Sequence, residues 1–256
     1  MEQDISSILH EWPYNPQSNI RIIKADKNRE VLQVRKPLGI EQYEIEGRPD
    51  GKRPFGRESV LAEFKERYAV HQKRMPEKNF SINHEDFLLL QEEALLNYYR
   101  YLILFQLGDM ERTIRDTENN LKICDLVDNF SSHDEDRKLL LQYKPYILRI
   151  NAVARAMLAI KQQMTMLGKE IIEDAITEIK NLPEINNMTF QFEKIRSLNY
   201  LKVTLSQLDE TKTITMLDQL KLELEDAVKI ENYEKAAEIR DRIQELTKEI
   251  DHSAPK

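Results

Sequence analysis

The chain has 256 residues, 41% of them hydrophobic, so it is long enough to fold around one large core or two small ones. Its 38 Lys and Arg against 45 Asp and Glu give a formal net charge of -7, which excludes a uniformly basic nucleic-acid-binding protein. A single cysteine, Cys124, excludes an intrachain disulfide and a multi-cysteine zinc site, and without a leader-like N-terminus it favours the cytoplasm.

The N-terminal part is predicted to contain a small sheet. Four of the six glycines fall between Gly39 and Gly56, which indicates a different architecture there from the rest of the chain. Three short segments contain β-branched residues and are separated by turn residues: 20–24, 31–36 and 40–45. We expect an antiparallel meander, covered by helices because three strands alone are marginally stable. A helix is expected next, over 58–74.

From Asn83 onward the pattern is that of long helices joined by short loops, so sequential helices should be antiparallel neighbours. The predicted helices are 84–107, 109–129, 134–166, 169–181 and 188–208. Asn83 is placed to cap the first helix, and Leu107-Gly108-Asp109 predicts a stop followed by a restart. Residues 98–121 resemble a degenerate tetratricopeptide unit, although Tyr101, Thr113 and Asn120 stand where small residues are usual.

The predicted fold is therefore mainly α. An α+β segment, 1–80, includes a Gly/Arg-rich loop at 47–59, and an array of helical hairpins follows over 81–208. A polar linker is expected at 209–215 and a helical hairpin at 216–251. The most apolar segment, 87–107, is interrupted by Gln91, Glu92, Glu93, Asn97 and Arg100, so no membrane span is expected.

The C-terminal hairpin is predicted from two apolar seams at helical spacing. The first seam consists of Leu217, Leu220, Leu224 and Val228. The second consists of Tyr233, Ala236, Ala237, Ile239, Ile243, Leu246 and Ile250. Ile230-Glu231-Asn232 separates them, and Asn232 suits a turn or a helix cap. The small Ala227, Ala236 and Ala237 permit a close approach of the two helices.

The order of side chains in 227–246 resembles the UVR domain, the UvrB/UvrC motif. Tyr233-Glu234 corresponds to the aromatic-Glu pair, Ala236-Ala237 to the double alanine and Arg240-Asp241 to the Arg-Asp pair. Ile243 and Leu246 follow at the apolar spacing of the motif. The resemblance implies a hairpin of the kind through which excision-repair subunits contact each other. The Glu231–Glu234 turn is more similar to that of McsA-like adaptors of protein arginine kinases than to that of the excision-repair subunits.

The remainder of the chain resembles uncharacterised bacterial proteins that contain the same motif. The similar strings are Gly47-Arg-Pro-Asp-Gly51, Arg115-Asp-Thr and Gln142-Tyr-Lys-Pro-Tyr146. Neither a Walker loop nor a carboxylate-rich nuclease pattern occurs, and the cysteine-rich zinc modules of McsA are absent. The motif thus occurs without the machinery of the enzymes that carry it.

The first functional hypothesis is a non-enzymatic adaptor without cofactors. Its hairpin would dock onto a UVR-like or other helical hairpin of a partner, or onto a second copy. The expected partner-binding residues are Tyr233 and Glu234 at the turn, Ala236, Ala237 and Ile243 in the seam, and Arg240 with Asp241 for register. Ala237→Glu is expected to abolish binding because it places an unpaired charge in the seam.

The second hypothesis is a nucleic-acid-associated repair or regulatory factor. Arg48, Lys52, Arg53 and Arg57 lie in a glycine-rich loop and could contact phosphates. Pro49-Asp50-Gly51 is also a standard turn, whose arginines would be solvated or paired with the acidic body. We favour this second interpretation, because no lysine-serine pair follows the loop at Walker spacing.

Three further features favour structural roles. The acidic residues of His133-Asp134-Glu135-Asp136 suit a helix first turn better than a metal site, and the same holds for His84-Glu85-Asp86. Cys124 lies on an apolar helical face and is expected in the core rather than as a nucleophile. The tyrosines at 98, 99, 101, 143 and 146 are expected in the core or lining a groove, with stacking on bases as the alternative.

Overall fold

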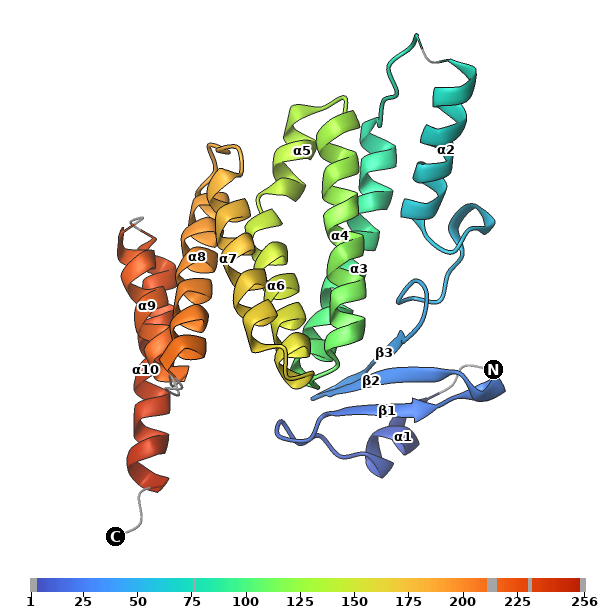
Figure 1. Ribbon diagram of the computed structural model, residues 1–256. Helices are drawn as coiled ribbons and strands as arrows, with labels where there is room; N and C mark the ends of the chain where they lie inside the picture. Colours follow the sequence, from blue (N-terminus) through green and yellow to red (C-terminus); the bar gives the residue numbers. More distant parts are fainter. Residues whose placement is uncertain (1–3, 76, 211–215, 230–231, 254–256) are drawn as a thin grey trace.

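The computed structural model describes residues 4–75, 77–210, 216–229 and 232–253. A three-stranded sheet lies across one end of an array of helices that stand side by side in chain order (Figure 1). The predicted fold class, mainly α with an N-terminal sheet and a C-terminal helix pair, is confirmed. Among the described residues, no helix has the length and apolar content needed to cross a membrane.

The sheet is the predicted antiparallel meander, with strand order β1 (Ile20–Lys24), β2 (Glu30–Lys36) and β3 (Gly39–Glu44). Its register places Leu32 opposite both Ile22 and Tyr43. The buried Leu32, Val34 and Tyr43 pack with Leu104, near the end of helix α3 (His84–Gln106). The helical array therefore covers the apolar face that three strands could not bury alone. A short helix, α1 (Ser6–Glu11), was not predicted.

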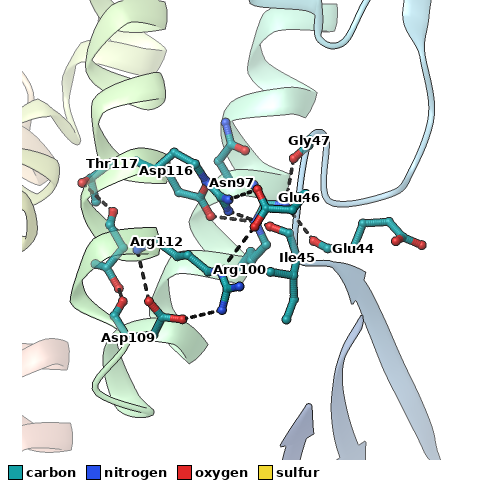
Figure 2. A network of polar contacts seen from close by, with 12 residues as sticks. Glu44, Ile45, Glu46, Gly47, Asn97, Arg100, Asp109, Arg112, Asp116 and Thr117 are labelled. Atoms are coloured by element: carbon teal, nitrogen blue, oxygen red, sulfur yellow. Dashed lines mark hydrogen bonds and ion pairs between the residues drawn. The ribbon is translucent and has the colours of Figure 1, made fainter. Parts of the chain in front are cut away.

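A buried ion pair fastens the chain after β3 to the body (Figure 2). Arg100 of α3 is 1% exposed and makes two hydrogen bonds of 2.7 Å to the carboxylate of Asp116, which is 0% exposed. The same guanidinium donates to the carbonyl oxygens of Glu44 at 2.7 Å and Gly47 at 2.8 Å. Arg115 adds a hydrogen bond of 2.7 Å to the carbonyl of Ile45. The buried guanidinium of Arg100 therefore makes all four of these hydrogen bonds to oxygen atoms, at 2.7 to 2.8 Å.

The helices of the body are α2 (Val60–Arg74), α3, α4 (Met110–Phe130), α5 (Asp134–Leu141), α6 (Lys144–Lys161), α7 (Thr165–Asn181) and α8 (Met188–Glu210). Asn83 caps α3 as predicted, accepting a hydrogen bond of 2.8 Å from the backbone N–H of Asp86. Gly108, at φ +77°, separates α3 from α4, and Asp109 caps the restart. The tetratricopeptide resemblance of 98–121 falls on this pair and stays a prediction.

The single helix predicted over 134–166 is wrong. The structure divides it into α5 and α6 at Gln142 and Tyr143. Pro145, in the first turn of α6, has no N–H to donate and would clash with the preceding turn of a continuous helix. Gln163, at φ +64°, then ends the helical segment, and α7 begins at Thr165, earlier than the predicted 169.

The C-terminal hairpin consists of α9 (Met216–Lys229) and α10 (Tyr233–Ser253), which pack on each other, and α9 also packs on α8. Of the predicted linker 209–215, residues 209 and 210 continue α8, whereas 211–215 lie outside the described residues. The same holds for Ile230 and Glu231 of the predicted turn. The side chains of Leu217, Leu246 and Ile250 also lie outside the described part.

Candidate functional site

The inner seam of the hairpin is formed by small and branched side chains. Ala227 of α9 and Ala236 and Ile239 of α10 are buried together, and Phe192 of α8 joins the same cluster. Alanines permit the close helix approach that the sequence indicated. The ring of Phe192 therefore covers the seam from the side of the body. This contact was not predicted.

The turn between the helices is stabilised by Asn232. Its backbone N–H donates to the carbonyl of Ala227 at 2.9 Å, and its side-chain oxygen accepts from the N–H of Lys235 at 3.2 Å. Asn232 thus ends one helix and caps the next, as expected for an asparagine at this position.

The residues predicted to contact a partner lie on two different faces. Tyr233 is 67% exposed, and Glu234, Arg240 and Asp241 are also exposed. In contrast, Ala236 is buried in the inner seam, and Ala237 and Ile243 are half-buried. Arg240 pairs with its neighbour Asp241 at 2.9 Å. We call Val228, Tyr233, Glu234, Arg240 and Asp241 the outer face of the hairpin.

Polar contacts between α8 and α9 surround the inner seam. Arg196 forms an ion pair of 3.1 Å with Glu223, and Asn199 donates a hydrogen bond to Asp226. The Oδ1 atom of Asp226 has no hydrogen-bond partner, and the Lys229 ammonium lies 3.6 Å from it. Burial raises the pKa of Asp226, although the hydrogen bond from Asn199 opposes this.

Of the four basic residues in the loop, Arg48 is turned inward. Its guanidinium contacts Asp50 at 2.9 Å, Glu92 at 3.0 Å and Glu93 at 3.3 Å. Burial acts to lower the pKa of Arg48, but the hydrogen bonds to Asp50 and Glu92 outweigh it and raise that pKa. Glu93 also accepts from the N–H groups of Val60 and Leu61 at the start of α2. Arg48 therefore holds the loop, α2 and α3 together and does not face solvent.

The other three basic residues lie nearer the surface. Arg57 pairs with Glu66 and, at 3.5 Å, with Glu63. Lys52 is exposed, with its ammonium 3.8 Å from Asp50, and Arg53 is exposed. The phosphate-binding hypothesis thus depends on Lys52 and Arg53, and it stays a prediction.

The histidine clusters and Cys124 have internal environments. Nδ1 of His84 lies 2.9 Å from Oδ1 of Asp136, which brings together two clusters that the sequence presented separately. Within the described residues, no three His, Cys, Asp or Glu side chains are arranged to hold a metal ion. Cys124 is buried, and burial raises its pKa to about 12, which keeps the thiol protonated.

The tyrosines at 98, 101, 143 and 146 line one groove of the helical body, and Tyr99 is exposed beside it. They come from α3, α6 and the break before α6, so the groove depends on the interruption at Tyr143. Helical spacing placed some of these rings on one face of α3, but it could not show that α6 supplies the opposite wall.

Comparison with known families supports the assignment of the hairpin. The model of the UvrB/uvrC motif matches residues 215–249, which span α9, the turn and most of α10. No curated protein and no solved structure matches the chain, so the resemblance of the remaining residues to uncharacterised bacterial proteins stays a prediction. The C-terminal hairpin of this protein carries a UvrB/UvrC motif.

Proposed function

We propose that the protein is an adaptor without catalytic activity of its own, which binds a partner through the outer face of its hairpin. The supporting observation is that the UvrB/UvrC motif coincides with a helix pair whose outer face is exposed. Val228 is 50% exposed and Tyr233 is 67% exposed, so an apolar and an aromatic side chain are available to a partner.

The charges on this face favour a partner of similar construction. Arg240 and Asp241 are adjacent and exposed, so they present both charges at one level of α10. A second hairpin with the same pair, placed antiparallel, can exchange these ion pairs reciprocally. The partner is therefore a protein with a UVR-like hairpin or a second copy of this chain. The candidate pathways for this partner are DNA excision repair and a stress-response kinase system.

Tyr233→Asp in the full-length protein tests this proposal. The charge should prevent apolar packing on the outer face without disturbing the fold, because the side chain is largely in water. Leu38→Asp is the matched control, since Leu38 is 92% exposed and lies far from the hairpin in the turn between β2 and β3. Sedimentation reports self-association, and affinity capture with mass spectrometry reports other partners.

The expected result is that Tyr233→Asp loses self-association, or loses capture of a protein with a UVR-like hairpin, while Leu38→Asp retains it. Circular dichroism should give the same helix content for both variants. If Tyr233→Asp associates and captures like the wild type, the outer face is not the binding site and the adaptor proposal fails.

A nucleic-acid-associated function has weaker support, namely the exposure of Lys52 and Arg53. Its test is the affinity for a labelled DNA duplex at low and high salt. Affinity that falls steeply with salt and is lost in a Lys52→Gln/Arg53→Gln double variant would favour it over the adaptor function.

A further inference from the structure

A groove of about 890 Å³ lies in the helical body, lined by residues of α3, α4, α5, α6 and α8. Its lining includes Tyr98, Tyr101, Tyr143 and Tyr146. None of these four hydroxyl groups makes a hydrogen bond to another described residue. Burial raises the pKa of Tyr98, Tyr101 and Tyr146, so their hydroxyls stay neutral and can both donate and accept.

The rim of the groove is apolar and exposed. Leu88 and Leu95 of α3 are 47% and 48% exposed, and Leu139 of α5 and Tyr143 face water to a similar extent. With Tyr99, the α3 side chains form a stripe that extends over about 16 Å at the rise of an α-helix. An exposed apolar stripe of this length, bordered by tyrosines, fits an elongated protein segment better than a compact small molecule.

One end of the groove is formed by Glu193 and Arg196 of α8. Arg149 of α6 lies beside them, 4% exposed, with its guanidinium carbon 4.9 Å from the ring centre of Tyr146 and 5.2 Å from that of Tyr200. Nε and Nη1 of Arg149 and Nε of Arg196 are buried and meet no acceptor. Oε2 of Glu193 is also buried without a donor. Three guanidinium N–H groups against one carboxylate oxygen are thus unmatched at this end, and a buried donor without a partner is costly.

The charge balance at this end depends on the hairpin. Arg196 contacts Glu223 of α9 at 3.1 Å and Glu193 at 3.9 Å. With the hairpin docked, Glu193 and Glu223 balance the charges of Arg149 and Arg196. When the hairpin leaves, Glu223 leaves with it, and one positive charge is left uncompensated beside the groove. A carboxylate from another molecule then has a place to bind.

We propose that the groove binds an apolar segment of a partner protein that carries a carboxylate, and that this carboxylate takes the place of Glu223 at Arg196. The apolar side chains of the segment pack on the leucines and tyrosines of the groove. Because the carboxylate and Glu223 compete for one guanidinium, an occupied groove weakens the docking of the hairpin on α8. The groove site itself does not depend on the proposed function. One consequence does rest on it, namely that the released hairpin becomes available to a second partner.

Two variants of the same ion pair test this site. Arg196→Gln and Glu223→Gln both remove the ion pair between these two residues. If the ion pair served only to hold α9 on α8, both variants would change ligand binding in the same direction. Random 12-residue peptides displayed on phage are selected against the full-length protein, and the enriched peptides are measured by fluorescence anisotropy. We expect enriched peptides to combine apolar residues with Asp or Glu.

We expect Arg196→Gln to weaken binding about tenfold, the loss of one charged hydrogen bond, and Glu223→Gln to strengthen it. Tyr143→Ala should also weaken binding, whereas Tyr14→Ala, a tyrosine of similar exposure outside the groove, should not. Peptides without acidic residues, or equal affinity for both ion-pair variants and the wild type, would overturn the proposal.

Failure to enrich any peptide would also overturn the proposal. If the groove instead binds 1-anilinonaphthalene-8-sulfonate in a Tyr143-dependent way while no peptide binds, it takes small organic anions and the partner-segment proposal is wrong. Tyr233→Asp must leave peptide binding unchanged, because Tyr233 lies on the outer face of the hairpin. The failure of this site is therefore distinguishable from the failure of the adaptor proposal.

Discussion

The sheet and the C-terminal hairpin are both attached to the same helical body, but through contacts of different quality. At the sheet, Arg100 is buried and has oxygen acceptors on every side, two from Asp116 and one each from the carbonyls of Glu44 and Gly47. At the hairpin, Asp226 is buried and its Oδ1 atom has no hydrogen-bond partner. Arg100 and Asp116 at the sheet thus have hydrogen-bond partners for all their polar side-chain atoms, whereas Oδ1 of Asp226 at the hairpin has none.

This difference has a physical consequence. A satisfied buried pair stabilises the arrangement because any separation exposes or orphans charged groups. An unsatisfied polar atom lowers the free energy gained by docking, since water would satisfy it in the released state. We therefore expect the sheet to stay attached to the body and the hairpin to be the part that a partner can displace.

The largest effect is expected from Arg100→Ala. The substitution leaves the buried Asp116 with Arg115 alone, at 3.0 Å from Oδ1, and deprives two carbonyls of their donor. The free energy of unfolding should therefore fall by about 3 kcal/mol. Urea denaturation followed by circular dichroism measures it. Arg112→Ala is the control, because Arg112 pairs with Asp109, Glu46 and Glu30 but is 32% exposed. It should cost less than about 1 kcal/mol.

Equal costs for Arg100→Ala and Arg112→Ala would contradict the view that the sheet is locked by a buried pair. The loop at Gly47 would then be held by its apolar contacts and by surface charges alone.

A more local effect is expected from Phe192→Ala. Removing the ring leaves a cavity against Ala227, Ala236 and Ile239, at a cost of about 3 kcal/mol to the docked hairpin. Hydrogen–deuterium exchange should become faster in α9 and α10 and stay unchanged in α3 and α4. Tyr233→Ala, on the outer face, should leave exchange in α9 unaltered. Faster exchange throughout the body would show that the hairpin is an inseparable part of the core.

The smallest effect is a pH dependence of hairpin docking. The pKa of Asp226 is raised above the ordinary carboxyl value of 3.8 in the docked state, so that state binds the proton more tightly than the released one. Docking should be strongest in acid, weaken as the pH rises from 3.8 through the raised pKa, and be constant above it. Glu225 and Lys229 also face this carboxylate.

Asp226→Asn should remove this part of the pH dependence and make docking stronger at neutral pH, because no charge is then buried. Denaturation of the hairpin followed at a series of pH values, for wild type and variant, measures it. A variant that retains the wild-type pH dependence would assign the titration to another group.

Local signals in the sequence predicted the elements well. The strands agree to within one or two residues because β-branched segments and turn residues are adjacent in the chain. Asn83, Gly108 and Asn232 marked helix ends because capping involves residues only a few positions apart. The hairpin followed from helical periodicity and from the order of side chains in the UvrB/UvrC motif. Pro145 also gave a local signal for the break between α5 and α6, but the prediction overlooked it.

The surroundings of these elements were decided by the tertiary structure. Arg48 lies in a glycine-rich turn that is equally compatible with a free basic loop, and its partners Glu92 and Glu93 are more than forty residues away. Phe192 has no sequence feature that assigns it to the hairpin. The sequence by itself determined the strands, most of the helices and the motif, because these depend on neighbours in the chain. Only the fold decided which charges are paired, which seam is covered and where a groove opens, because those contacts join distant segments whose approach is set by packing.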